Sequence, residues 1–315
     1  MFNENIKKLQ NKINSDLNSI YSSGPQSLVE TFNYVISGKG KRIRPLLTIL
    51  TSNSLFNDFD KSYNAALAIE ILHNFTLVHD DIMDDDSIRH GKETVHNKWD
   101  NSTALLTGDL MLAKSLKILS DSNYNDKVIK SFNSALVAVC EGQALDKEFE
   151  SIENISANDY YKMIEKKTSN LIAMPIEIGA LAYEYPDEQC NLLFNYGLNI
   201  GKAFQINDDY LEIVSTSEIM QKSLDSDVLL GKKTFPIILC NEVDKNFVSD
   251  LKNNVDNVKD IISHLRTFIE QHKIDLEIKN SINNFYENAK NQIENINFIN
   301  DSLTNFVNRL KKRDK

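Results

Sequence analysis

The sequence predicts an all-α protein, and three observations support this fold class. The chain has 315 residues but only 5 prolines and 10 glycines, and no proline falls between Pro45 and Pro175. Apolar residues recur three or four positions apart, and no series of short alternating strands is present. Because proline and glycine interrupt helices, so long a stretch without breakers favours long helices packed as a bundle.

The first part of the chain contains the helix that we expect at the centre of the bundle. Residues 61–83 are apolar almost all round, from Ala65 to Val78, which is typical of a helix surrounded by others. Residues 22–25 contain Gly24 and Pro25, and residues 38–42 contain Gly38 and Gly40, as expected between the helices that precede it. The helices predicted here cover residues 3–22, 26–37, 44–56 and 61–83.

Helical periodicity continues to the end of the chain, with one interruption. Residues 216–232 lack periodicity and carry scattered charges, which predicts a loop. No long linker, low-complexity segment or repeat is present, so we expect a single domain over residues 1–315. The remaining predicted helices cover residues 101–120, 125–150, 158–183, 188–214, 234–243, 247–270 and 276–312, the last broken around 294–297.

Composition excludes several classes of protein. The net charge of -10 and a pI near 5.2 argue against nucleic acid as the main partner. Cys140, Cys190 and Cys240 are far apart, which indicates reduced, buried thiols in a cytoplasmic protein. The polar N-terminus has no signal-peptide pattern, and no apolar run reaches the 18 residues typical of a transmembrane helix.

Two acidic clusters carry the strongest functional signal. Residues 80–84 read Asp-Asp-Ile-Met-Asp and residues 208–212 read Asp-Asp-Tyr-Leu-Glu, so each has carboxylates at positions i, i+1 and i+4. On a helix, positions i and i+4 share a face, and like charges there repel each other. One such cluster is usually a solvated helix face, but two matched clusters after apolar segments favour Mg²⁺ sites, which we expect to face a shared cavity.

Basic residues in three segments predict anion binding near these metals. The glycine-broken segment 38–45 carries four cations at the start of a helix, where exposed N–H groups also favour anions. The other two segments hold Lys166 and Lys167, and Lys222, Lys232 and Lys233. Each is also compatible with an ordinary solvated loop or pair. Together with Mg²⁺, they predict a site for at least one diphosphate.

The order and spacing of these segments resemble the trans-isoprenyl diphosphate synthases (polyprenyl synthetases) over nearly the whole chain. Residues 68–84 resemble the first aspartate-rich motif of that family, and residues 201–209 resemble the second. The resemblance implies an all-α bundle around a deep central cavity, the type I isoprenoid synthase fold, and a homodimer. Supporting matches lie at residues 40–45, 107–109, 141–143, 167–168 and 231–236.

The resemblance also implies a role for each candidate residue. About three Mg²⁺ ions would bridge the allylic diphosphate to the acidic residues Asp80, Asp81, Asp84, Asp208, Asp209 and Glu212. The same diphosphate would be bound by Arg89, Lys167, Lys222 and Lys232, with Thr168 and Gln205 nearby. Isopentenyl diphosphate would be bound by Lys41, Arg44, His73 and His90. The allylic C–O bond would ionise, and the double bond of isopentenyl diphosphate would attack the cation.

Three residues depart from the family pattern. Glu212 replaces an aspartate but keeps a carboxylate. His90 stands where a second arginine usually follows Arg89, and neutral imidazole binds anions more weakly than guanidinium. Asp225 replaces a glycine that is common before the last lysines, so the resemblance does not define the geometry of that loop.

Residues before the first acidic cluster bear on product length. Phe75 precedes Asp80 by five residues, about 7.5 Å along a helix. In the family a bulky aromatic here stops elongation, whereas Thr76 is small where animal farnesyl enzymes carry a second aromatic. These features favour a C20 product, geranylgeranyl diphosphate, with C15 as the alternative.

Two other functions share features with this sequence. A terpene cyclase is disfavoured because Leu211 and Ser215 occupy the serine and glutamate positions of the cyclase metal motif. A non-catalytic synthase subunit is disfavoured because the acidic residues are retained.

Overall fold

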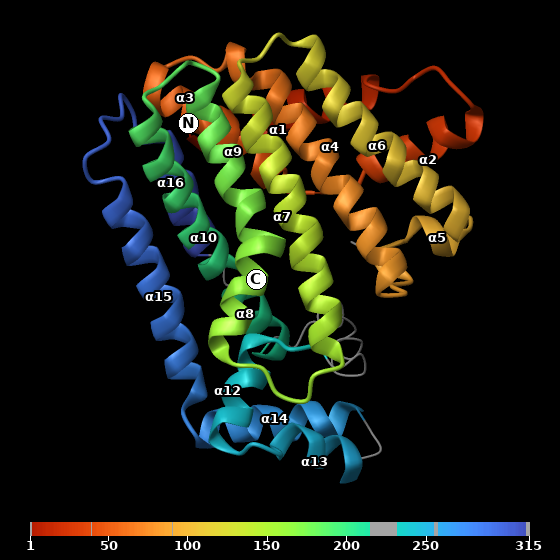
Figure 1. Cartoon of the computed structure of the whole chain (residues 1–315), viewed down its shortest axis with the longest axis vertical. Coiled ribbons are helices and arrows are strands. Elements are labelled where there is room, and N and C mark those ends of the chain that lie inside the picture. The colour runs from red at the N-terminus through yellow and green to blue at the C-terminus, as the bar shows by residue number, and fades with distance from the viewer. Residues whose placement is uncertain (1, 39, 90, 215–231, 255–257, 313–315) are drawn as a thin grey trace. The chain divides into compact units, whose positions relative to one another are not determined.

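The computed structural model describes residues 2–38, 40–89, 91–214, 232–254 and 258–312, and these parts are almost entirely helical (Figure 1). The predicted all-α class is confirmed. The elements in chain order are α1 (Phe2–Ser19), α2 (Gln26–Ile36), α3 (Ile43–Phe56), α4 (Asp60–Met83), β1 (Ile88–Arg89), β2 (Lys92–Glu93), α5 (Val95–Lys98), α6 (Asn101–Asp121), α7 (Asp126–Glu150), α8 (Ala157–Ile164), the π-helical turn η1 (Glu165–Ser169), α9 (Asn170–Leu181), α10 (Asp187–Val214), α12 (Phe235–Val243), α13 (Phe247–Asn254), α14 (Val258–Gln271), α15 (Ile274–Gln292) and α16 (Ser302–Lys311).

Most predicted helices agree with the structure within a few residues, and the differences are local. The helix predicted over 158–183 is divided into α8, η1 and α9. The segment predicted over 276–312 is divided into α15 and α16. The short antiparallel hairpin β1–β2, which pairs Ile88 with Glu93, was not predicted. The loop predicted over 216–232 falls almost wholly outside the described residues.

The chain divides into two compact units, each assembled from separate segments. Unit 1 comprises Met1–Asn133, Met174–Cys190 and Asn297–Thr304. Unit 2 comprises Ser134–Ala173, Asn191–Ile296 and Asn305–Lys315. The expectation of a single domain over residues 1–315 stays a prediction.

Helix α4 is the centre of unit 1, as its apolar surface predicted. It packs against α3 and α6, and its residues from Ala65 to Leu72 are buried. Near its end, α6 comes very close, because a Cβ atom on Gly108 would lie 2.2 Å from Nε2 of His79. The absence of a side chain on Gly108 therefore leaves room for the His79 ring, one residue before the first acidic cluster.

The core of unit 2 forms around α12, which packs against α8, α13, α14 and α15. Phe235 at the start of α12 stacks on Tyr160 of α8, with ring centroids 5.4 Å apart. Among the described helices of the chain, none combines the length and hydrophobicity that a membrane span requires.

Candidate active site

The first acidic cluster occupies the last turn of α4. Asp81 and Asp84 are buried and Asp80 is half-buried, and the N–H of Asp84 donates to the carbonyl of Asp80. The C-terminal end of a helix carries a partial negative charge, which disfavours carboxylates. Three carboxylates at this place are therefore stable together only if cations offset their charge.

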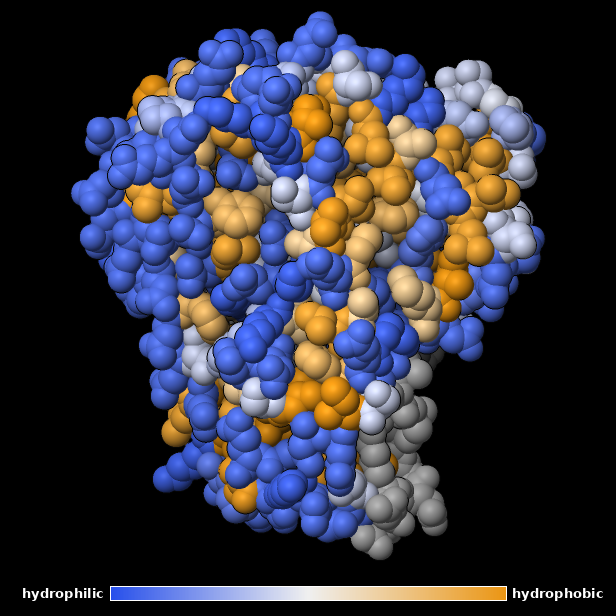
Figure 2. All heavy atoms as spheres, viewed as in Figure 1, coloured by the Kyte–Doolittle hydropathy of each residue, from blue (hydrophilic) through white to orange (hydrophobic). Residues whose placement is uncertain are grey.

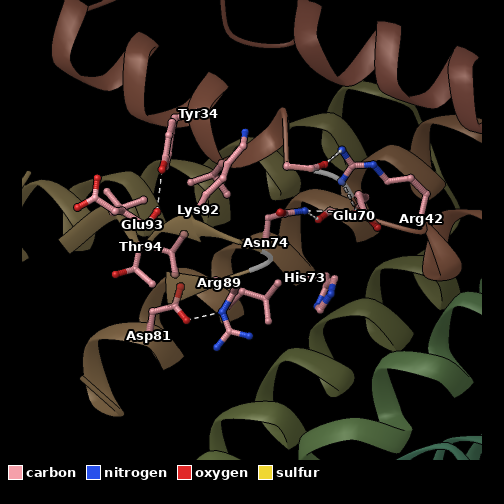
Figure 3. A pocket seen from close by; sticks show the side chains of 16 residues that line it. Tyr34, Arg42, Glu70, His73, Asn74, Asp81, Arg89, Lys92, Glu93 and Thr94 are labelled. Carbon is pink, nitrogen blue, oxygen red and sulfur yellow. Dashed lines mark hydrogen bonds and ion pairs between the residues drawn. The ribbon is translucent and has the colours of Figure 1, made fainter. Parts of the chain in front are cut away.

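One of those cations is Arg89, on the hairpin that follows α4. Its Nε donates to Oδ1 of Asp81 (Figure 3), and its Nη2 donates to Oδ2 of Asp86 at 3.2 Å. Burial raises the pKa of Asp81 to about 6, and the guanidinium of Arg89 opposes this rise. The predicted diphosphate ligand Arg89 is thus brought against the first acidic cluster.

A pocket of unit 1 brings together residues from three predicted segments. It is lined by side chains of the α2–α3 connection, of α4 and of the β1–β2 hairpin, including His73, Asp81 and Arg89 (Figure 3). Nε2 of His73 lies 2.9 Å from Nη1 of Arg44, so two predicted isopentenyl diphosphate ligands are in direct contact. Lys41, three residues before Arg44 in the α2–α3 connection, is exposed.

The second acidic cluster lies on α10 in unit 2, and Asp209 is its buried member. Oδ2 of Asp209 accepts from the Tyr160 hydroxyl at 2.7 Å and from the backbone N–H of Phe235 at 3.0 Å. Oδ1 accepts from Nε2 of Gln205 at 2.8 Å, and Oε1 of Gln205 accepts from the Thr168 hydroxyl at 2.8 Å. Thr168, Gln205 and Asp209 are therefore joined in one chain of hydrogen bonds.

Tyr160 was missed by sequence reasoning, because a tyrosine at an apolar position of a helix is a normal core residue. Its side chain is 1% exposed, and burial keeps the pKa of its hydroxyl well above the usual range. The hydroxyl therefore stays protonated and donates to the carboxylate of Asp209. The carboxylate of Asp209 thus links α8, α10 and the first residue of α12.

Lys167 lies in the π-helical turn η1, which two glycine contacts accommodate. A Cβ atom on Gly142 would lie 2.2 Å from the backbone N of Lys167, and one on Gly201 would lie 2.4 Å from Cα of Ser169. Nζ of Lys167 forms an ion pair of 2.5 Å with Asp146, a buried carboxylate that was also missed. Such turns are frequent at functional sites, because the extra residue redirects the side chains around it.

Three residues with predicted roles, His90, Lys222 and Asp225, lie outside the described residues, and their roles stay predictions. Lys232 lies two residues before Thr234, the N-cap of α12, and lines a pocket of unit 2 with Lys233. Burial lowers the pKa of Lys233. In the described parts of the chain, the acidic, histidine and cysteine side chains do not gather in threes around a common point.

We expect Tyr160→Phe to lower the free energy of unfolding by about 1–3 kcal/mol, because it leaves buried Asp209 with one donor fewer. Ring packing against Phe235 is preserved, so the change reports on the hydroxyl alone. Urea unfolding followed by circular dichroism measures the difference. Tyr161→Phe is the matched control, since its half-buried hydroxyl bonds to Ser281 instead. Equal stability of Tyr160→Phe and the wild type would contradict the prediction.

Comparisons with known proteins identify relatives of this chain. The family model described as polyprenyl synthetase matches residues 25–272. A geranylgeranyl diphosphate synthase of Sulfolobus acidocaldarius is 34% identical over 284 residues, covering 87% of this chain and 86% of the relative. A geranylgeranyl pyrophosphate synthase of Geoglobus acetivorans is 38% identical over 243 residues, covering 76% of each chain.

The fold is shared with solved structures of the same kind. A crystal structure of a geranylgeranyl pyrophosphate synthase superposes with a TM-score of 0.90 at 31% identity, covering 98% of this chain and 99% of the other. The all-α fold that the resemblance implied is thereby confirmed. With a family match over most of its length and relatives above 30% identity, the chain belongs to the polyprenyl synthetase family.

Proposed function

We propose that the protein is a short-chain trans-prenyltransferase that condenses isopentenyl diphosphate with allylic diphosphates, with geranylgeranyl diphosphate (C20) as its main product. The observation that carries the proposal is the pocket of unit 1, which is lined by His73, Asp81 and Arg89. Arg44 contacts His73, and Arg89 binds Asp81 of the first acidic cluster. Relatives named geranylgeranyl diphosphate synthase at 34–38% identity support the C20 product.

Four carboxylates are the metal ligands that we propose. Asp80 and Asp84 lie one turn apart on α4, and Asp208 and Glu212 lie one turn apart on α10. Each pair fits Mg²⁺, which prefers oxygen ligands and uses few carboxylates when a substrate supplies phosphate oxygens. Bound Mg²⁺ would supply positive charge to the leaving diphosphate.

Asp81 and Asp209 are the second carboxylates of the two clusters. Both are buried and already accept hydrogen bonds, Asp81 from Arg89 and Asp209 from Tyr160 and Gln205. The resemblance also implies metal binding by both residues. We propose that their main contribution is to hold Arg89 and Gln205 in place beside the ligands.

The remaining side chains bind and orient the two substrates. Lys167 and Lys232 would stabilise the negative charge that develops on the departing allylic diphosphate. Lys41, Arg44 and His73 would hold isopentenyl diphosphate so that its double bond faces the cation. The proton lost after condensation needs no protein base, because the departed diphosphate can accept it.

One assay tests the proposal directly. The protein is incubated with Mg²⁺, isopentenyl diphosphate and, in turn, the C5, C10 and C15 allylic diphosphates, and the products are sized by mass spectrometry. We expect all three primers to yield mainly C20. Absence of product with every primer would refute the function, and accumulation of C15 from the C5 primer would replace the product with farnesyl diphosphate.

We further propose that the protein is a homodimer, as the family resemblance implies, and that α6 contributes to the interface. Leu105, Leu106 and Leu116 are exposed on this helix, and Leu105 and Leu116 are 11 residues apart, about three turns, so they share a face. Figure 2 shows hydrophobic atoms on the surface where Figure 1 places α6. A second copy would cover this surface through the same residues of both chains.

We expect Leu106→Glu to convert the dimer into monomers, because it places a charge in an apolar interface. Light scattering during size-exclusion chromatography measures the mass. Leu276→Glu is the matched control, since Leu276 on α15 is exposed to a similar degree, 52% against 57% for Leu106. A dimer that persists in Leu106→Glu would place the interface elsewhere.

A further inference from the structure

Arg42 is a buried cation in the basic segment 38–45, in which Lys41 and Arg44 are more accessible. Its side chain is almost fully enclosed, with the residue 5% exposed. Nη1 donates to Oε1 of Glu70 and Nε donates to Oδ1 of Asn14, each at 2.7 Å. Nη2 donates to the carbonyls of Ile36 at 2.6 Å and Gly38 at 3.1 Å. One guanidinium thus connects α1, the end of α2 and the middle of α4.

The backbone of Arg42 is held in a conformation that most residues avoid. Its φ is 52° and its ψ is 40°, in the left-handed region, directly before α3 begins at Ile43. Such a conformation persists in a residue other than glycine only when its surroundings enforce it. Here the four hydrogen bonds of the side chain do so, with the backbone of the neighbouring Lys41 also fixed by a hydrogen bond from Gln10 at 2.8 Å.

The contact with Glu70 sets the position of two predicted substrate ligands. Glu70 lies one turn before His73 on α4, and Arg42 lies two residues before Arg44 on α3. The Arg42–Glu70 pair therefore sets the distance between α3 and α4 where Nη1 of Arg44 lies 2.9 Å from Nε2 of His73. Figure 3 shows Arg42 joined to Glu70 beside His73 at one side of the pocket.

We infer that Arg42 is a positioning residue for isopentenyl diphosphate. Arg42 binds Glu70 and the carbonyls at the end of α2. It thereby holds the connection between α2 and α3 against α4, so that Lys41 and Arg44 lie on the same side as His73. This inference rests on the proposed function. Arg42 itself would touch no substrate. It would fix the position of Lys41, Arg44 and His73, so its replacement should affect isopentenyl diphosphate alone.

Two variants separate positioning from stability. Arg42→Met alone leaves the buried carboxylate of Glu70 without its cation, and such a change is strongly destabilising. The double variant Arg42→Met/Glu70→Met removes both charges and keeps the volume apolar, so it regains stability. We expect it to melt above Arg42→Met but to retain a KM for isopentenyl diphosphate raised about tenfold.

The kinetic pattern identifies the role. In the double variant, the KM for the allylic primer and the kcat at saturating isopentenyl diphosphate should remain near the wild-type values. Arg42→Lys, which keeps the charge but has no fork to bind Asn14, Glu70 and the carbonyls at once, should fold and show the same selective rise. This variant decides the question if the double variant does not fold.

Ser52→Ala is the matched control on α3. The buried Ser52 hydroxyl bonds to Ser62 and to the carbonyl of Gly179, so its loss should reduce stability and leave both KM values unchanged. A wild-type KM for isopentenyl diphosphate in folded Arg42→Lys or the double variant would overturn the inference. A wild-type enzyme that forms no product from isopentenyl diphosphate would instead overturn the proposed function, and the inference with it.

Discussion

Asp80→Asn is expected to lower kcat for condensation by about 10²–10³-fold, whereas Asp85→Asn is expected to leave it nearly unchanged. Asp80 is half-buried at the first position of the acidic cluster, one turn from Asp84. An amide in its place keeps the shape of the side chain but removes the negative charge that a divalent cation requires. Ionisation of the allylic diphosphate would then lose part of its electrostatic stabilisation.

Asp85 makes a closely matched control for this change. It follows the cluster directly, its side chain is fully exposed, and its φ of 55° is one that asparagine also tolerates. Steady-state kinetics with a Mg²⁺ titration, and thermal unfolding of each variant, distinguish lost metal binding from lost structure. A decrease in kcat of less than a few-fold in folded Asp80→Asn, or an equal decrease in Asp85→Asn, would contradict the proposed role of the cluster.

The central helix of unit 1 was predictable because its sequence leaves one interpretation. A segment that is apolar almost all round from Ala65 to Val78 and then ends in carboxylates is stable mainly when other helices surround it. The β1–β2 hairpin and α5 were not predictable in the same way. They comprise two to four residues each, too few for a periodicity, and they are polar and mostly exposed.

The division of residues 158–183 shows where periodicity fails. A π-helical turn inserts one extra residue into the helix. Apolar residues before and after the turn still recur every three or four positions, so the sequence reads as one continuous helix. The signal was present in Gly142 and Gly201, which lie on other helices and contact the turn. Glycine within a helix has a cost in stability and therefore points to close packing, but its partner is evident only in three dimensions.

The residues of the candidate site could be proposed from the sequence, but their burial could not. Sequence reasoning singled out the acidic and basic segments. It gave no indication that Arg42 is buried while Lys41, next to it, is exposed. Nor did it distinguish Asp209, enclosed by three donors, from Asp208 beside it. Burial depends on contacts between distant segments, and these are absent from local patterns of charge.

The second large effect concerns product length and depends on Phe75. This residue is 8% exposed, and its ring meets the His79 ring edge-on, with centroids 4.7 Å apart. His79 in turn fills the space left by Gly108 on α6, and its Nε2 lies 3.3 Å from the carbonyl of Leu105. The Thr76 hydroxyl donates to the carbonyl of His73 and is thus occupied within α4. The Phe75 ring therefore packs against His79, and His79 packs against α6, so the ring has little room to rotate away.

We accordingly expect Phe75→Ala to shift the products from C20 towards C25 and longer chains, and Phe75→Leu to do so less. Removing the ring leaves a cavity that a growing chain can occupy, at a cost of about 3–5 kcal/mol in stability. Phe32→Ala is the control, because Phe32 is fully buried in the same unit on α2 and should lose stability without altering product length. Mass spectrometry of products from the C15 primer measures the shift. If folded Phe75→Ala still released only C20, the limit on elongation would lie in another side chain, because the ring proposed to stop the growing chain would be absent.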